Sequence, residues 1–238
     1  YPNIEFIHIT KDESKGGNYA RNMGIKRAQG KYVAFCDDDD YWISTKIEEQ
    51  LKIFKENEDV GAVYCGYHVQ HRNGEIFKAM PKTITEESLD KYILYHFLTL
   101  SSALIVKKDL LFQVGLFDEN LKFWQDYELT IRLAQITRFE FVPDYLMVYL
   151  RDLSDKNRLT NKFDSWFEAV EYIHKKHKAL YDKLNWFENL QYKYQVLRDA
   201  EERTETANLV RLYRRFKVKR KFLKYVIWLV RFYQNIKN

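Results

Sequence analysis

The chain has few of the residues that cross-link or interrupt a fold: of its 238 residues, two are cysteine, eight glycine and three proline. The two cysteines offer no disulfide framework, which favours a reducing, cytosolic compartment. Scarce glycine and proline exclude a low-complexity or collagen-like chain. The longest apolar run near the end, residues 225–230, is far too short to span a bilayer. The first residues show no basic-then-apolar leader, so we expect no signal peptide.

Apolar residues make up 46% of the chain and aromatic residues 16%, which is enough for a substantial core. The length suits one large domain, or one domain with an appendage. The net charge of +5 is unevenly distributed, because residues 208–238 contain ten Lys or Arg and no Asp or Glu. A mildly acidic body is therefore followed by a basic tail.

Strand and helix patterns alternate through the first ~150 residues. Strand patterns occupy residues 4–9, 32–36, 60–67, 102–106 and 139–149, and helix patterns occupy residues 18–29, 44–57, 85–97, 108–114 and 125–135. The Asn-Gly pair at residues 73–74 predicts a hairpin turn. The alternation predicts an α/β fold with a mostly parallel sheet. From residue 161 onward only helical patterns follow.

The stretch FCDDDDYW, residues 35–42, places four carboxylates directly after an apolar run. Two neighbouring carboxylates near a surface repel by roughly 3 kcal/mol at an effective dielectric constant of ~20. Such a run needs water, hydrogen bonds or a cation to relieve the repulsion. Because ligands of open α/β sheets bind beyond the carboxyl ends of strands, this position favours Mg²⁺ or Mn²⁺ held for a substrate's phosphates. The alternative is a solvated turn that caps the next helix.

Two longer stretches resemble the family 2 glycosyltransferases, enzymes with the GT-A fold. GGNYARNMGIKRAQGKYVAFCDDDDYW, residues 16–42, is similar to the family's Gly/Asn-rich loop, Ala-Arg-Asn-x-Gly-Ile segment, apolar strand and Asp-x-Asp-Asp. GLFDENLKFWQDYELTIRL, residues 115–133, is similar to its Gly-x-Phe-Asp-Glu segment followed by Glu-Asp-x-x-Leu. Residues 149–151 are a third, shorter match to a Tyr-Arg pair. The resemblance covers residues 1–155.

The resemblance implies a GT-A, Rossmann-like and mostly parallel sheet with helices on both faces, in a partial domain over residues 1–155. Residues 156–238 are expected to form an all-helical C-terminal extension with a basic amphipathic tail at residues 208–238. The family normally opens with a Pro-x-Tyr/Phe-Asn strand and a strand ending in Asp-Asp-x-Ser, which hold the nucleobase and the ribose. Neither pattern occurs in the chain, so we expect it to lack these nucleotide-binding strands.

By the same resemblance, the acidic run supplies the two acids of an Asp-x-Asp motif. Asp39 is expected to contact the metal on the donor's diphosphate, and Asp37 to lie near the nucleoside. Asp40 matches an acid that supports the site or contacts the sugar, and Asp38 falls at the variable position.

Arg21 and Asn22 match the family's Ala-Arg-Asn segment, which implies that they support the donor pocket; hydrogen bonding between helix and loop is the alternative for both. Arg151 is expected to pair with the diphosphate, or else to form a surface salt bridge. Ser101 and Ser102 resemble the small residues that line the sugar site, and a turn at the start of a strand is the alternative.

Asp126 matches the family's catalytic base. Inverting glycosyl transfer needs a base that takes the proton from an acceptor hydroxyl, and it needs stabilisation of the departing diphosphate. A carboxylate beside an aromatic residue, here Trp124, can have its pKa raised by desolvation. The alternative is an acid favoured at a helix N-terminus by the macrodipole. The family usually has Glu where this chain has Gln125, which concerns the type of acceptor more than catalysis.

The basic tail keeps apolar residues at helical spacing with Lys and Arg between them, which is typical of a helix on an anionic membrane surface. Nucleic-acid binding and a helix packed on the domain are the alternatives. The core has no recognisable nucleic-acid module, so we expect no nucleic-acid partner. His174 and His177 form an HKKH pattern, which we interpret as a solvated helix face rather than a zinc site.

Together these patterns predict an inverting glycosyltransferase that depends on Mn²⁺ or Mg²⁺. The resemblance implies a nucleotide-sugar donor, most simply a UDP-sugar, and a saccharide or lipid-linked saccharide acceptor in surface polysaccharide synthesis. The expected location is cytoplasmic, with peripheral contact at the inner face of the plasma membrane. Two alternatives remain: a phosphoryl-transfer or nuclease enzyme that holds two metals on the Asp cluster, and an inert GT-A fragment that binds a membrane or a partner.

Overall fold

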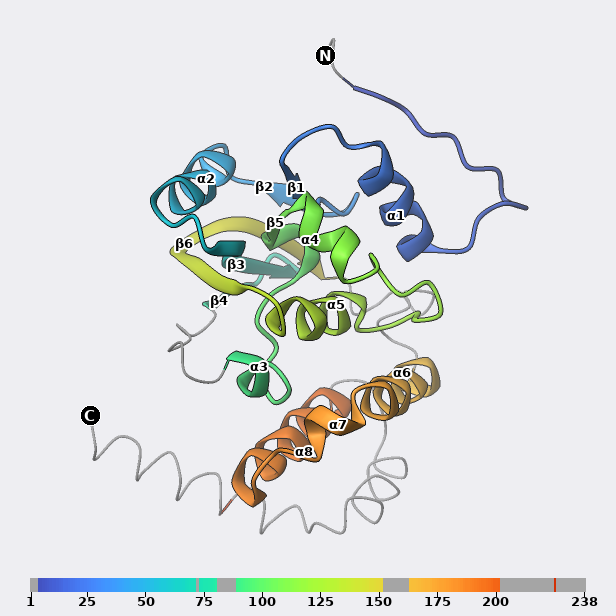
Figure 1. Cartoon of the computed structure of the whole chain (residues 1–238), viewed down its shortest axis with the longest axis vertical. Coiled ribbons are helices and arrows are strands. Elements are labelled where there is room, and N and C mark those ends of the chain that lie inside the picture. Colours follow the sequence, from blue (N-terminus) through green and yellow to red (C-terminus); the bar gives the residue numbers. More distant parts are fainter. Residues whose placement is uncertain (1–3, 72, 81–88, 152–162, 202–224, 226–238) are drawn as a thin grey trace.

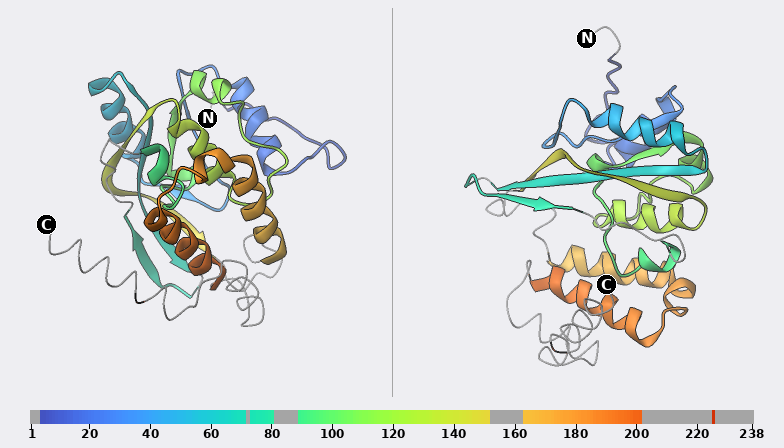
Figure 2. Two further views of the ribbon diagram at one scale, coloured as in Figure 1. Left: turned by 60° about the horizontal axis from the view of Figure 1, so that its bottom comes forward. Right: turned by 90° about the vertical axis from the view of Figure 1, so that its left-hand side faces the viewer.

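A mixed β-sheet forms the centre of the computed structural model, which describes residues 4–71, 73–80, 89–151, 163–201 and 225. Helices α2 and α5 lie on opposite sides of the sheet, and α6, α7 and α8 form a further layer beyond α5 (Figures 1 and 2). The strands are β1 (Tyr32–Ala34), β2 (Tyr41–Trp42), β3 (Val60–His71), β4 (Ile76–Ala79), β5 (Ile105–Lys107) and β6 (Arg138–Arg151). The helices are α1 (Gly17–Arg27), α2 (Lys46–Glu56), α3 (Leu89–Tyr92), α4 (Lys108–Gln113), α5 (Gln125–Ala134), α6 (Phe163–Lys176), α7 (Lys178–Tyr181) and α8 (Trp186–Glu201).

The strand order is β1-β5-β3-β6-β2, with β4 paired to β3. Layered α/β architecture with helices on both faces is as predicted, but the prediction of a mostly parallel sheet is wrong for the described strands. Among them only β3 and β6 pair in parallel, and the other four pairings are antiparallel. The apolar runs could not reveal this, because a strand covered on both faces reads as continuously apolar whichever way its neighbour runs.

Two hydrophobic clusters cover the two faces of the sheet. On β3, Tyr64 joins the cluster on the α5 side, while Val63 and Cys65 face the cluster that includes Phe54 of α2. The α5-side cluster also contains Trp166 of α6, together with buried residues of α8. The predicted domain boundary at residue 155 lies outside the described residues, but the helices beyond it share a core with the sheet.

Most predicted elements lie within a few residues of the observed ones. Gly74 has φ +89° and donates its N–H to the His71 carbonyl oxygen at 2.9 Å, which confirms the Asn-Gly hairpin between β3 and β4. The strand predicted at residues 4–9 is wrong: these residues are irregular, and Phe6 is 90% exposed. No strand of the described ranges lies beside them, and an extended segment without a neighbour has no hydrogen-bond ladder. The basic tail lies outside the described residues, apart from Tyr225.

Gly61 in β3 allows a close approach that any side chain would prevent. A Cβ at this position would lie 2.1 Å from Thr137 Oγ1 and 2.2 Å from Leu110 Cδ1. We therefore expect Gly61→Ala to lower the free energy of unfolding by about 1–3 kcal/mol, as overpacked sites do. Urea denaturation followed by circular dichroism measures the change.

Gly24 provides the matched control, because it lies within α1, where an added Cβ would have open space within 4 Å. Gly24→Ala should raise the free energy of unfolding by about 0.5–1 kcal/mol, since alanine loses less conformational entropy in a helix than glycine does. Equal effects of the two substitutions would contradict the steric explanation for Gly61.

Candidate active site

A cavity of about 820 Å³ lies where the segment after β1 and the end of β6 meet the first turns of α1 and α5. Six predicted site residues line the cavity, namely Arg21, Asp37, Asp39, Asp40, Asp126 and Arg151; Ser101 also lines it, whereas Asn22 and Ser102 do not. These residues come from segments as much as 130 positions apart in the sequence. The fold therefore brings the acidic run and Asp126 to one cavity.

The acidic run forms a tight turn between β1 and β2. The Asp40 N–H donates to the Asp37 carbonyl oxygen at 3.1 Å, which closes the turn. Asp37 Oδ1 pairs with Arg21 Nη2 of α1 at 2.6 Å, and the Asp37 N–H donates to Ser102 Oγ at 3.0 Å. Part of the repulsion within the run is thus relieved by an arginine, while a buried serine fixes the backbone of the turn.

Within the acidic run, the negative charge of Asp40 is the one that its surroundings stabilise least. Burial, together with the neighbouring charges of Asp39 and Asp37, raises the pKa of its carboxyl to about 6, although hydrogen bonds from Ser102 and the Leu150 backbone partly oppose the shift. Its Oδ1 is buried and has no hydrogen-bond partner among the residues that the structure describes. A hard cation at this point would satisfy that oxygen, so the donor set fits Mg²⁺ or Mn²⁺.

The cation would not be caged by protein alone. Within the described ranges there is no group of three or more His, Cys, Asp or Glu side chains arranged to hold a metal. Mg²⁺ usually binds one or two carboxylates and takes its other ligands from water and substrate phosphates. The acidic run fits a cation of that kind, which arrives with an anionic substrate.

Asp126 lies in the first turn of α5 and is half-buried in the cavity. Burial raises the pKa of its carboxyl, and the charge of Asp37 raises it further. The Tyr127 N–H, which donates to Asp126 Oδ1 at 2.8 Å, and the charge of Arg21 oppose the shift. A carboxylate with a raised pKa at the wall of a cavity is suited to accept a proton.

Trp124 holds the start of α5 in an unusual backbone conformation. Its φ is +56°, in the left-handed region that bulky residues rarely adopt. Its ring packs against Phe97, with 4.7 Å between centroids, and against Trp166 of α6, with 5.7 Å. These ring contacts stabilise Trp124 in its strained backbone conformation. The local sequence carries no sign of the conformation, because the residues that hold Trp124 are distant along the chain.

Asn22 is buried outside the cavity and ties α1 to the segment before α5. Its Nδ2 donates to the Phe117 carbonyl oxygen at 2.9 Å, and its Oδ1 accepts the Phe117 N–H at 2.9 Å. Asn18, one turn earlier, donates to the Asp118 and Leu121 carbonyl oxygens at 2.7 and 2.8 Å. Asn22 thus forms the helix-to-loop hydrogen bonds given as its alternative role, and it lies outside the cavity. Consecutive helical residues point about 100° apart, so Arg21 can face the cavity while its neighbour does not.

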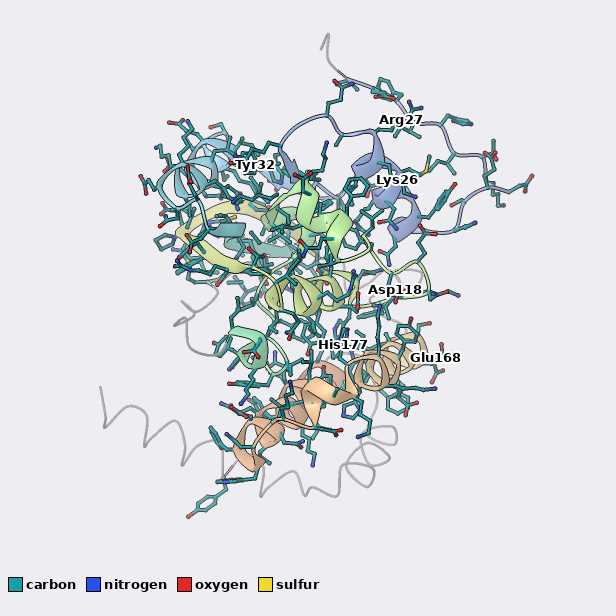
Figure 3. The ribbon with its side chains drawn as sticks, in the orientation of Figure 1. Lys26, Arg27, Tyr32, Asp118, Glu168 and His177 are labelled. Atoms are coloured by element: carbon teal, nitrogen blue, oxygen red, sulfur yellow. The ribbon has the colours of Figure 1, made fainter. Side chains whose placement is uncertain are left out.

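A buried ionic network connects α5 to the helical layer beyond it. Glu128 of α5 is fully buried and bonds Arg132 Nη2 at 2.6 Å, Lys176 Nζ at 2.9 Å and His177 Nε2 at 3.0 Å. Lys176 also bonds Asp118, and Figure 3 shows Asp118 and His177 where the two layers meet. The interpretation of His177 as part of a solvated face is wrong. Its partner lies 49 positions away, beyond the reach of sequence spacing.

Burial by itself would raise the pKa of Glu128, but its three partners outweigh burial and lower the pKa from 4.5 to about 2. Because the pKa is lower in the folded chain, the stabilisation is fully present above pH ~4.5 and is lost as the pH falls towards ~2. We expect Glu128→Gln to reduce the free energy of unfolding at pH 7 by about 2–4 kcal/mol, since it removes the buried charge that Arg132 and Lys176 share. The variant should also lose much of the dependence on pH in this window, as measured by chemical denaturation at several pH values.

Glu168 is the control for this prediction, because it is an exposed acid on α6 in the same layer. Glu168→Gln should leave both the stability at pH 7 and its pH dependence as in the unmodified protein. If both Gln variants behaved alike, the network would not supply the stabilisation.

Two cavity residues had no signal in the sequence. Tyr67 of β3 lies in the cavity, and burial followed by the charge of Asp126 raises the pKa of its hydroxyl to about 12. Asp199 of α8 reaches the same cavity from the helical layer. Neither residue belongs to a local motif, so only the folded chain identifies them.

Comparison with known proteins adds the family. The family model described as "Glycosyltransferase like family 2" matches residues 4–218. An uncharacterized glycosyltransferase of Methanocaldococcus jannaschii is 29% identical over 145 residues, which are 60% of this chain and 50% of that protein. The Escherichia coli protein WfaP, a UDP-Glc:alpha-D-GlcNAc-diphosphoundecaprenol beta-1,3-glucosyltransferase, is 44% identical over 64 residues, 27% of this chain and 25% of that protein. The chain spans about half the length of the first curated relatives it matches.

The fold also has a counterpart among solved structures. Residues 1–349 of S. aureus TarS, in complex with UDP-GlcNAc, align with a TM-score of 0.53 at 17% identity, covering 82% of this chain and 64% of that chain. At this identity the likeness shows the shared GT-A fold alone. The family model covers most of the sequence, including the acidic run, Asp126 and the helices that follow the sheet. The chain therefore belongs to the glycosyltransferase-like family 2.

Proposed function

We propose that this chain forms the catalytic part of an inverting, metal-dependent glycosyltransferase. The observation that carries the proposal is the single cavity shared by the acidic run and Asp126. In glycosyl transfer, the leaving diphosphate needs its negative charge stabilised, and the attacking hydroxyl needs a base that accepts its proton. The two sets of carboxylates match these two needs.

In the proposed mechanism, Asp126 accepts the proton of an acceptor hydroxyl as its oxygen bonds to the anomeric carbon of the donor sugar. The bond from that carbon to the diphosphate oxygen breaks, and the diphosphate leaves with the electron pair. Attack opposite the leaving group inverts the anomeric configuration. Asp39, with Asp40 in support, would hold Mn²⁺ or Mg²⁺, and a cation bound there would neutralise charge on the diphosphate. Arg21, which is fixed by Asp37, and Arg151 would add positive charge on the donor side.

The donor is proposed to be a UDP-sugar, in line with the UDP-glucose named for WfaP and the UDP-GlcNAc bound by TarS. The acceptor is proposed to be a saccharide or a lipid-linked saccharide, as in the E. coli relative. In the part of the chain that the structure describes, no helix has both the length and the apolar character of a membrane span. Contact of the basic tail with the inner membrane face is a separate prediction, which sedimentation with anionic phospholipid vesicles would measure.

A donor screen tests the function directly. The full-length protein is mixed with UDP-glucose, UDP-N-acetylglucosamine or GDP-mannose, with and without Mn²⁺, and its melting temperature and nucleotide release are measured. We expect one UDP-sugar with Mn²⁺ to raise the melting temperature, because a ligand that binds the folded state stabilises it. Cleavage of nucleic acid without sugar transfer would support the nuclease alternative. Absence of both binding and turnover would support the inert module.

A further inference from the structure

The helical layer contributes a carboxylate to the cavity. Asp199 lies near the end of α8 and lines the cavity, although α8 belongs to the layer beyond α5 (Figure 1). Its Oδ2 accepts a hydrogen bond from Trp166 Nε1 of α6 at 2.6 Å. Trp166 is fully buried, so this bond fixes the carboxylate on a rigid support.

Trp166 also packs against the start of α5, the helix that carries Asp126. The Trp166 ring packs edge-on against Trp124, with 5.7 Å between centroids, and Trp124 lies two residues before Asp126. Asp199 is thus hydrogen-bonded to one tryptophan of a packed pair, and Asp126 follows the other tryptophan in the sequence. The distance between these two carboxylates is therefore set by packing in the core rather than by the course of a loop.

The surroundings of Asp199 in the cavity suit a sugar. Aromatic side chains of Tyr67, Phe97, Trp124 and Tyr149 line the cavity together with the carboxylates. Pockets for neutral ligands combine apolar and aromatic walls with a few placed polar groups, and a carboxylate accepts strong hydrogen bonds from hydroxyls. A diphosphate, by contrast, would be repelled by an additional carboxylate. Asp199 is therefore matched to a neutral sugar ring of the acceptor rather than to a diphosphate.

We propose that Asp199 accepts a hydrogen bond from a hydroxyl of the acceptor sugar, other than the attacking one, and so determines which acceptors are used. This inference rests on the proposed function. It assigns part of the acceptor specificity to the helical layer, outside the stretches at residues 16–42, 115–133 and 149–151 that carry the family's short motifs.

The test uses the full-length protein, UDP-glucose with Mn²⁺, and N-acetylglucosamine α-linked to a diphosphate with a short alkyl chain as the acceptor probe. For Asp199→Asn we expect kcat/KM for the probe to fall about 10- to 100-fold, as for loss of a hydrogen bond to a charged group. The slow release of UDP to water without acceptor is measured alongside, because it needs only the donor and the site of Asp126 and so separates loss of acceptor recognition from general damage to the site.

Monodeoxy analogues of the probe identify the hydroxyl. In the unmodified protein, removing the recognised hydroxyl should cost about the same 10- to 100-fold in kcat/KM. In Asp199→Asn the same removal should cost almost nothing, because the partner is already lost. A merely structural role would not produce this dependence on one hydroxyl.

Two further variants complete the design. Trp166→Phe keeps a ring in the core but removes the Nε1 donor, so it should lower kcat/KM for the same hydroxyl while UDP release to water persists. Asp182→Asn changes an exposed acid that pairs with Lys178 in the same helical layer, and it should behave as the unmodified protein. If Asp199→Asn kept full kcat/KM with every analogue, or lost UDP release to water as severely as transfer, the inference would be overturned. If the unmodified protein released no UDP under any condition, the proposed function itself would fail.

Discussion

Replacing Asp126 with asparagine is expected to lower the rate of sugar transfer by about 10²–10⁴-fold, the usual contribution of a positioned general base. Asparagine has nearly the same shape but cannot accept the proton of the attacking hydroxyl. The free energy of unfolding should stay equal or rise, because burial raises the pKa of Asp126 and so disfavours its charged form in the folded protein. Initial rates of UDP release with acceptor, together with urea denaturation, measure both effects.

The control for Asp126 is Asp109, an exposed acid in the first turn of α4. Asp109→Asn removes a helix N-terminal charge and should cost only about 0.3–1 kcal/mol of stability with no change in rate. If Asp126→Asn behaved in the same way, Asp126 would be an ordinary helix N-terminal acid and the base would have to be sought elsewhere.

Replacing Asp39 with asparagine should lower the rate of transfer by about 10²–10³-fold, since a bound cation contributes several kcal/mol of charge stabilisation. Asp39 is exposed at the cavity wall, so the substitution should have little effect on folding. The concentration of Mn²⁺ needed for half-maximal activity should rise at the same time. A titration of the transfer rate against Mn²⁺ in the variant and the unmodified protein measures both changes.

Asp38→Asn separates a ligand role from a general electrostatic role. Each substitution removes one negative charge from the same turn, so a diffuse effect of charge would give equal losses at both positions. A cation held by Asp39 predicts a much smaller loss for Asp38 and an unchanged Mn²⁺ requirement. Equal losses would contradict the assignment of Asp39 as the metal ligand.

The predicted site residues that the structure brings to one cavity are those that a short stretch of chain encodes. The acidic run follows an apolar strand, and Asp126 lies in the first turn of a helix whose apolar residues recur at helical spacing. Both positions could therefore be inferred from local pattern and family resemblance. The Asn-Gly hairpin was equally local. Each of these features depends on residues within a few positions of one another.

The features that the sequence did not predict depend on partners far along the chain. Strand direction follows from how β5 lies between β1 and β3, which no apolar run records. The hydrogen-bond partner of Asn22 is Phe117, and that of His177 is Glu128. Asp199 enters the cavity because α8 packs beneath α5, and its own segment of sequence carries no motif.

The asparagines of α1 have a consequence for how the reaction geometry arises. Asn18 and Asn22 fasten α1, which carries Arg21, to the segment that leads into Asp126. Arg21 and the proposed base Asp126 are therefore held in place during folding, before any substrate arrives. Entropy that would otherwise be lost on bringing these groups together at each turnover is already spent, so binding energy remains available for orienting the two sugars.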